Sequence, residues 1–161
     1  MIEIPRGIVQ LVEVHAREAF PEECCGFLLG SGKRRRRVVE ARRARNLAAD
    51  NRRRRYIIDP LELLRADDEA RTQHLDLIAI YHSHPNHPAK PSEFDRSHAA
   101  SWYSYIILRI DDRQPREMTA WRFDESSQRF EPEKLILDPK DTAARSRSRV
   151  GRSTRSSTGE P

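Results

Sequence analysis

The sequence predicts an α/β (α+β) fold in which helices flank one mixed β-sheet. Three observations favour this class: a helical repeat of apolar residues near the N-terminus, a capped helical pattern after Pro60, and short apolar segments between these helices. With 161 residues and 37% hydrophobic content, the chain can bury one modest core. We therefore expect one domain at residues 1–138 and a tail at residues 139–161.

The first predicted helix is amphipathic. From Ile8 to Ala19, apolar residues recur at steps of three and four, and Pro5 stands where a helix can begin. Pro21 ends the pattern. The uniformly apolar segment CCGFLLG at residues 24–30 then predicts a short buried strand, because it is too brief for a helix.

An arginine-rich segment follows. A glycine-rich turn at residues 30–32 leads to a second strand, whose arginines we expect on a solvent-exposed face. The four-arginine runs at residues 34–37 and 52–55 are interpreted as edge-strand and loop charge rather than a binding patch. The segment YIIDP at residues 56–60 predicts a short strand that ends at the proline.

The second helix is predicted directly after this strand. Asp59 is expected as its N-cap and Pro60 in its first turn, and Leu61, Leu64 and Ala70 are expected on its apolar side.

The C-terminal half of the domain predicts three more strands and a short helix. Residues 75–85, LDLIAIYHSHP, are the clearest strand in the chain, and its polar end carries two histidines. Residues 92–101 predict a short helix capped by Ser92, and residues 103–111 and 118–124 predict a hairpin-like pair of strands.

The positive charge of the chain is concentrated in the tail. The net charge is +5 and the pI about 9.6, but residues 139–161 hold six basic and two acidic residues, so the rest of the chain is close to neutral. Because this Arg/Ser-rich tail has one valine as its only sizeable apolar residue, we expect it to be disordered. We expect no nucleic-acid binding by the folded domain.

Membrane and disulfide classes are disfavoured. The apolar runs are far shorter than the roughly 20 residues that cross a bilayer, and the N-terminus lacks a signal pattern, so we expect a cytoplasmic protein without a membrane segment. Cys24 and Cys25 are adjacent and too few for a disulfide scaffold or a thiolate zinc site. The sequence leaves the oligomeric state, monomer or dimer, open.

The segment YHSHPNHPAKPSEFD at residues 81–95 suggests a metal site. His82 and His84 share one face of a strand, because alternate residues point to the same side. Two imidazoles are favoured zinc ligands, and a catalytic zinc usually takes a third protein ligand. A tight return from strand to helix could bring the Asp95 carboxylate beside the histidines, with Ser92 facing the same cavity.

The spacing His-x-His-x(7)-Ser-x(2)-Asp, met by His82, His84, Ser92 and Asp95, resembles the motif of the JAMM zinc metalloproteases, also called the JAB1/MPN (Mov34) family. An upstream glutamate in a P-x-E-x-C-G context belongs to the same pattern, and PEECCG supplies it with Glu23. The body of the chain is similar to the compact bacterial members, which act on ubiquitin-like sulfur-carrier proteins.

This resemblance implies a curved mixed sheet in a three-layer architecture, similar to cytidine deaminases. It implies one Zn²⁺ per chain, held by His82, His84 and Asp95. Glu23 would accept a proton from water and pass it to the departing amine, and Ser92 would donate to the oxyanion. The implied substrate is an amide or isopeptide bond at the C-terminal tail of a ubiquitin-like protein.

Nearby residues receive plainer interpretations. We interpret Glu22 as a surface charge, His87 as a loop residue outside the ligand spacing, and Cys25 as a small buried hydrophobe. His98 is expected on the solvated surface of its helix, although a hydrogen bond to a ligand is an alternative. Asn46 could orient substrate from the end of the second strand.

Three rival functions stay open at this point. A non-catalytic MPN scaffold would usually lack part of the five-residue set, which is complete here. A zinc nucleobase deaminase would need a PCxxC segment, and the sequence has none. A nucleic-acid-binding protein would need basic residues on the domain itself, which is close to neutral.

Overall fold

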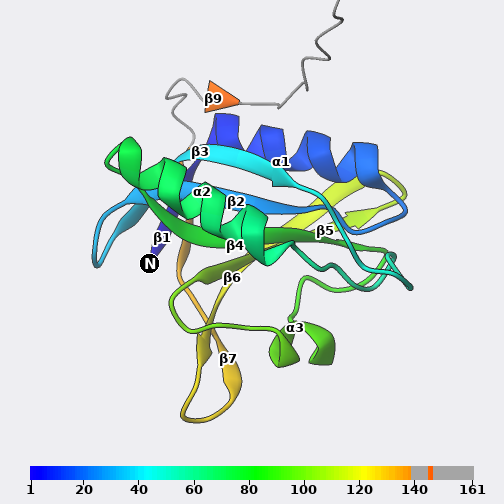
Figure 1. The fold of residues 1–161 in the computed structure, drawn as a ribbon. Coiled ribbons are helices and arrows are strands. Elements are labelled where there is room, and N and C mark those ends of the chain that lie inside the picture. The colour runs from blue at the N-terminus through cyan, green and yellow to red at the C-terminus, as the bar shows by residue number, and fades with distance from the viewer. Residues whose placement is uncertain (139–144, 147–161) are drawn as a thin grey trace, which may run out of the picture.

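One nine-stranded mixed sheet forms the spine of the structure, a computed structural model that describes residues 1–138 and Arg145–Ser146 (Figure 1). Eight strands follow the order β7-β6-β5-β4-β2-β3-β1-β8, and β9 pairs with β3. The bounds of the strands are β1 Ile2–Pro5, β2 Cys25–Ser31, β3 Arg36–Ala44, β4 Asp76–Pro85, β5 Ser104–Asp111, β6 Gln114–Asp124, β7 Arg129–Pro132, β8 Leu135–Asp138 and β9 Arg145–Ser146.

Three helices accompany the sheet: α1 Arg6–Ala19, α2 Pro60–Thr72 and α3 Glu93–Ser97. The expected disorder of the tail concerns mostly residues 139–144 and 147–161, which lie outside the described residues. Within the described part, no helix is both long and apolar enough to span a membrane.

The sheet separates two hydrophobic cores, one under each long helix. Ile8, Val12 and Ala16 of α1 pack against one face, with Leu28 among the strand residues that they meet. On the other face, Ala66 and Ala70 of α2 pack in a core with Phe27, the neighbour of Leu28 in β2. Alternate residues of a strand point to opposite faces, so α1 and α2 cover opposite sides (Figure 1). The result is the expected three-layer arrangement.

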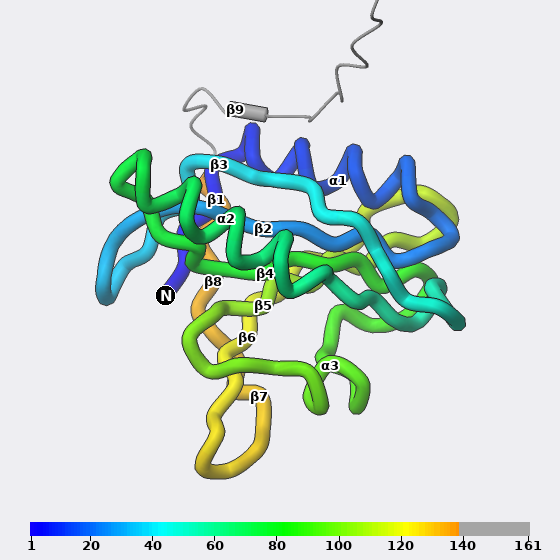
Figure 2. The backbone as a smooth tube through the Cα atoms, viewed as in Figure 1, coloured from blue at the N-terminus to red at the C-terminus, as the bar shows by residue number. Residues whose placement is uncertain are grey.

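The first helix follows the predicted pattern, but the strand before it was not predicted. β1 is fully buried and pairs in parallel with both β3 and β8. Figure 2 shows β8 running beside β1 at this end of the sheet. Four residues ending at Pro5 give too short a pattern to indicate a strand, and the pairing partners are distant in sequence.

The second helix begins as predicted, but its apolar side was partly wrong. The Asp59 carboxylate accepts a hydrogen bond of 2.9 Å from the Leu61 N–H, which confirms the N-cap. Leu61 and Leu64, however, are 58% and 60% exposed, whereas Ala66 and Ala70 are buried. The contact face of the helix is formed by the buried Ala66 and Ala70, with the half-buried Leu63 packed beside them.

Two other strand predictions need correction. Residues 56–59 are not in a β-ladder; Asn46 and Leu47 hydrogen-bond to Ile57 instead, so the segment is an anchored loop. The arginines of β3 are not all solvent-exposed, because β3 lies inside the sheet and Arg36 and Arg42 are each 9% exposed.

Arg36 joins three parts of the fold through its guanidinium. It donates to Ile78 O at 3.3 Å, to Ser104 Oγ at 2.5 Å and to the Glu133 carboxylate at 2.6 Å. Its side chain and that of Glu133 are 11% and 6% exposed. The guanidinium therefore connects β3 to β4, to β5 and to the segment before β8.

We predict that Arg36→Ala lowers the free energy of unfolding by about 2 kcal/mol, because the largely buried Glu133 carboxylate loses its guanidinium partner and keeps only the N-terminal ammonium and the Ser104 hydroxyl. Urea unfolding followed by circular dichroism measures the loss. Arg34→Ala is the matched control: it removes an equal charge from an exposed site and should cost less than about 0.5 kcal/mol. Equal losses in the two variants would contradict the assignment of Arg36 as a structural residue.

Candidate active site

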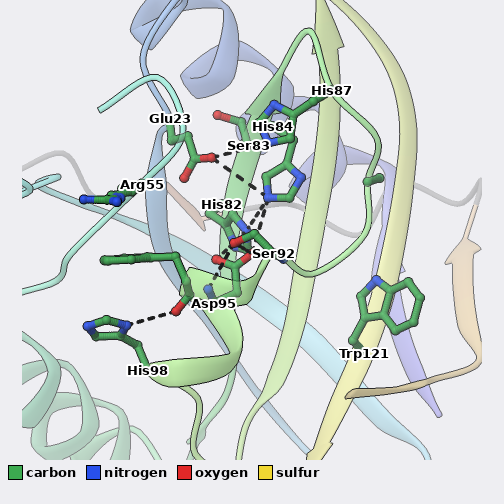
Figure 3. A network of polar contacts seen from close by, with 12 residues as sticks. Glu23, Arg55, His82, Ser83, His84, His87, Ser92, Asp95, His98 and Trp121 are labelled. Carbon is green, nitrogen blue, oxygen red and sulfur yellow. Dashed lines mark hydrogen bonds and ion pairs between the residues drawn. The ribbon is translucent and has the colours of Figure 1, made fainter. Parts of the chain in front are cut away.

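Two buried histidines lie at the end of β4, in the interior of the sheet. His82 and His84 are 0% and 1% exposed, and their Nε2 atoms lie 3.0 Å apart (Figure 3). β4 pairs with β2 on one side and β5 on the other, so both backbones are held by ladders. The expectation that the two imidazoles converge on one side is met.

Asp95 reaches the same point from the first turn of α3. Its Oδ1 lies 3.4 Å from His82 Nε2, and its Oδ2 lies 3.5 Å from His84 Nε2. The carboxyl is 5% exposed. The three side chains form a group whose ligand atoms all lie within 4.8 Å of one another, which is a geometry able to hold a metal ion.

The donor set suits zinc. His84 Nδ1 donates to Pro88 O at 2.7 Å, so Nε2 carries the free lone pair that a metal needs. His82 Nε2 faces the same point, while its Nδ1 is buried without a partner among the described residues. Two imidazole nitrogens and one carboxylate form a three-ligand set that leaves a position open for substrate or water.

The environment keeps Asp95 ionised. Burial alone would raise its pKa, but the nearby imidazoles of His82 and His84 and the hydrogen bond from the Ser92 N–H outweigh it, so the pKa falls well below its usual range. A deprotonated carboxylate is the form that coordinates metal.

Ser92 is bonded directly to Asp95. Its hydroxyl donates to Oδ2 at 2.7 Å, and its N–H donates to the same oxygen at 2.6 Å. The Asp95 N–H in turn donates to Ser92 Oγ at 3.1 Å, which completes a capping box for α3. The expected helix cap is thus confirmed, and the hydroxyl lies beside the group formed by His82, His84 and Asp95.

Glu23 approaches from the segment before β2. Its Oε1 lies 3.9 Å from His84 Nε2, it is 2% exposed, and its Oε2 is buried without a hydrogen-bond partner among the described residues. Burial raises its pKa to about 8; the charge of His84 opposes this rise, and that of Asp95 adds to it. The structure brings this carboxyl beside the imidazole pair but outside the group that His82, His84 and Asp95 form.

The position of Glu23 is fixed by hydrogen bonds on both sides. Cys24 N donates to Ser83 Oγ at 2.9 Å, and Ser83 N donates to Cys24 O at 3.1 Å, which ties this segment to β4. Glu23 N donates to Arg52 O at 2.7 Å. Asn46 Nδ2 donates to Glu23 O at 3.1 Å, so the arginine-rich loop is attached as well.

Asn46 therefore has a structural role rather than the suggested role in orienting substrate. Besides Glu23 O, its amide donates to Arg55 O at 2.9 Å, and its Oδ1 accepts from the N–H groups of Ala48 and Ile57. These four bonds use both ends of the side chain and hold the loop over residues 46–57 against Glu23.

His87 lies inside the site, which the sequence did not indicate. Its ring stacks on His84 with centroids 4.0 Å apart, and its Nε2 lies 3.7 Å from Glu23 Oε1. Burial lowers its pKa to about 4, against the effect of its hydrogen bond to Pro85. The sequence signal that could have indicated this is Asn86, a residue type that tolerates positive φ. Its φ is 56°, and the loop turns at this residue so that His87 lies against His84.

Two aromatic contacts complete the surroundings. The Tyr56 ring stacks on His82 with centroids 4.5 Å apart, a contact with no sequence signal because the two segments are distant in the chain. The guanidinium of Arg55 lies 5.2 Å from the ring centroid of Phe94, so the loop also touches α3. His98 stacks on Phe94 and lies within hydrogen-bond distance of its carbonyl, away from the metal ligands.

Comparison with known proteins identifies the family. A family model described as prokaryotic homologs of the JAB domain matches residues 5–124. The chain belongs to this family. The match spans both long helices and every residue of the predicted site, and it confirms the family resemblance that the motif suggested.

Two curated relatives and one solved structure are similar to the chain. A probable TtuB-protein conjugate cleaving protease of Thermus thermophilus is 34% identical over 108 residues, covering 67% of this chain and 70% of the relative. A desampylase of Haloferax volcanii is 38% identical over 119 residues, covering 69% and 81%. A JAB1/MPN domain protein of Archaeoglobus fulgidus has a TM-score of 0.55 and 18% identity, covering 84% and 98%, which confirms the fold.

We predict that Asn46→Asp lowers the free energy of unfolding by about 2 kcal/mol, because it replaces the amide donor to two carbonyls with an acceptor. Hydrogen exchange at residues 46–57 should rise as well. The same isosteric change at the exposed Asn51 is the control and should have little effect on either measurement. If both variants behaved alike, Asn46 would not be what holds this loop.

Proposed function

We propose that the chain is a zinc-dependent peptidase that hydrolyses an amide or isopeptide bond at the C-terminal tail of a ubiquitin-like protein of the sulfur-carrier type. The observation that carries this proposal is the convergence of His82, His84 and Asp95 with the buried carboxyl of Glu23, whose Oε2 has no hydrogen-bond partner among the described residues. The names of the relatives, a conjugate-cleaving protease and a desampylase, support the same class of activity.

In this proposal His82, His84 and Asp95 hold one Zn²⁺ per chain. When bound, zinc supplies a Lewis acid that polarises a carbonyl and lowers the pKa of water towards about 7. The protein contributes an ionised Asp95 and an imidazole, His84, whose tautomer is set by its hydrogen bond to Pro88 O.

Glu23 is the proton carrier in this mechanism. Its carboxylate accepts the proton of the attacking water and returns it to the departing amine, and the products are a carboxylate and an amine. Its unpartnered Oε2 is free to take this proton, and its fixed backbone keeps the carboxyl beside His84. His82, His84, Asp95 and Glu23 are all buried, so bulk water does not compete for the contacts among these side chains.

The Ser92 hydroxyl donates a hydrogen bond to the substrate carbonyl oxygen and stabilises the negative charge that develops on it. Its hydroxyl donates to Asp95 in the structure, and rotation about its Cβ–Oγ bond redirects the same proton towards substrate. Loss of one such donor costs about 3 kcal/mol of barrier in other hydrolases.

The substrate class is supported by the space around the cluster. An apolar pocket touches Asp95 and can take side chains of an extended tail; its lining includes Tyr56, Ile58, Leu63, Phe94 and Tyr105. Only six residues separate α3 from β5, so no large insertion covers this side of the site. The full five-residue set favours this enzyme over a non-catalytic scaffold.

We predict that His84→Ala and Glu23→Gln separate metal binding from hydrolysis. Metal analysis should give one tightly bound zinc for the wild-type protein, and His84→Ala, which removes a ligand, should lose it. Glu23→Gln keeps the three ligands and should retain that zinc while hydrolysis falls by at least about 100-fold, as expected for a lost general base. Tightly bound zinc retained in His84→Ala would exclude the proposed ligand set.

A second prediction concerns the substrate. Sulfur-carrier proteins of the ubiquitin fold, extended by one residue or an amine-linked lysine after Gly-Gly, should be trimmed to the free carboxylate. Intact-mass spectrometry reads the product directly. Parallel incubation with Glu23→Gln controls for contaminating peptidases. Intact substrates after incubation with the zinc-loaded wild-type protein would rule out this substrate class.

A further inference from the structure

A second group of possible metal ligands lies beside the first. The ligand atoms of Glu23, His84 and His87 all lie within 4.8 Å of one another, like those of His82, His84 and Asp95. His84 is common to both groups. Because its Nε2 has one lone pair, His84 can bind only one ion at a time.

His87 is arranged as a ligand rather than as a solvated loop residue. Its Nδ1 lies 2.9 Å from Pro85 O; a carbonyl only accepts, so Nδ1 carries the proton and Nε2 has the free lone pair. This Nε2 faces Glu23 Oε1 at 3.7 Å, as Figure 3 shows for the pair of side chains. The same tautomer is set in His84 by Pro88 O.

Glu23 supplies the second ligand. Its carboxyl is 2% exposed, and its Oε2 has no partner among the described residues, so a buried acceptor is left open at this point. His87 is 14% exposed by its side chain and forms the outer side of the group, which gives an ion a path from solvent. A carboxylate and an imidazole are a common ligand pair for zinc.

We propose that Glu23 and His87 form a second, weaker zinc site next to the first, and that its occupation inhibits the enzyme. With His84 engaged by the first ion, the second ion has two protein ligands, and water completes its coordination. The inhibitory part rests on the proposed function, because an ion on Glu23 occupies the carboxylate that must carry the proton.

Zinc titration of the chelator-stripped protein tests the site without any substrate. Equilibrium dialysis with metal analysis should give two equivalents for the wild-type protein, one tight and one weak. His87→Phe keeps a ring to stack on His84 but has no nitrogen, and it should lose the weak equivalent and retain the tight one. Glu23→Gln should do the same.

The control is His74→Asn. His74 is an exposed histidine with φ of 57°, a conformation that asparagine tolerates, so this variant removes a surface imidazole without strain. It should keep both equivalents. His82→Ala provides an independent check: it disrupts the first group but leaves Glu23, His84 and His87 intact, and it should still bind one equivalent.

Hydrolysis gives the second readout, as the ratio of the rate at excess zinc to the rate at one equivalent. The ratio should fall well below one for the wild-type protein and stay near one for His87→Phe. A single equivalent in the wild-type protein, or a weak equivalent that persists in both His87→Phe and Glu23→Gln, would overturn the site. Absence of hydrolysis in every protein would instead contradict the proposed function, while the stoichiometries would still test the site.

Discussion

The reciprocal hydrogen bonds between Cys24 and Ser83 are the constraint on which the site depends. They join the segment just before β2 to the end of β4, so Glu23 in that segment faces the histidines on either side of Ser83. The strands can approach this closely because of Gly26: a Cβ there would lie 2.3 Å from Arg42 O and 2.5 Å from the Tyr81 ring. This backbone arrangement places the Glu23 carboxyl beside the imidazole of His84.

Two equally buried carboxyl groups have opposite properties because their partners differ. Asp95 lies between both imidazoles and accepts hydrogen bonds from Ser92, so its pKa falls and it stays charged. Glu23 is as deeply buried but has an open oxygen, so its pKa rises. Neighbouring acids whose environments separate their pKa values are suited to different tasks, here the proposed roles of Asp95 as ligand and Glu23 as proton carrier.

Local patterns made much of this predictable. The histidine strand, the caps at Asp59 and Ser92 and the spacing from His82 to Asp95 each lie within a short segment of the chain. The short strands β1 and β8 were missed because they pair with each other across the length of the domain. The strand β7 was missed although it forms a local hairpin with β6, because its four residues give too short a pattern. The burial of Arg36 and the place of His87 in the site depend likewise on what the fold brings near, and no periodicity encodes it.

The brevity of α3 links the ion to the fold. Five residues cannot sustain a helix alone, and this one is held by its capping box, by the contact of Arg55 with Phe94, and at the cluster by Asp95. An ion bound to Asp95 would therefore act as a fourth support from within. Removal of such an ion by a chelator would loosen this turn of backbone, so an ion bound there would also stabilise the segment that carries Asp95.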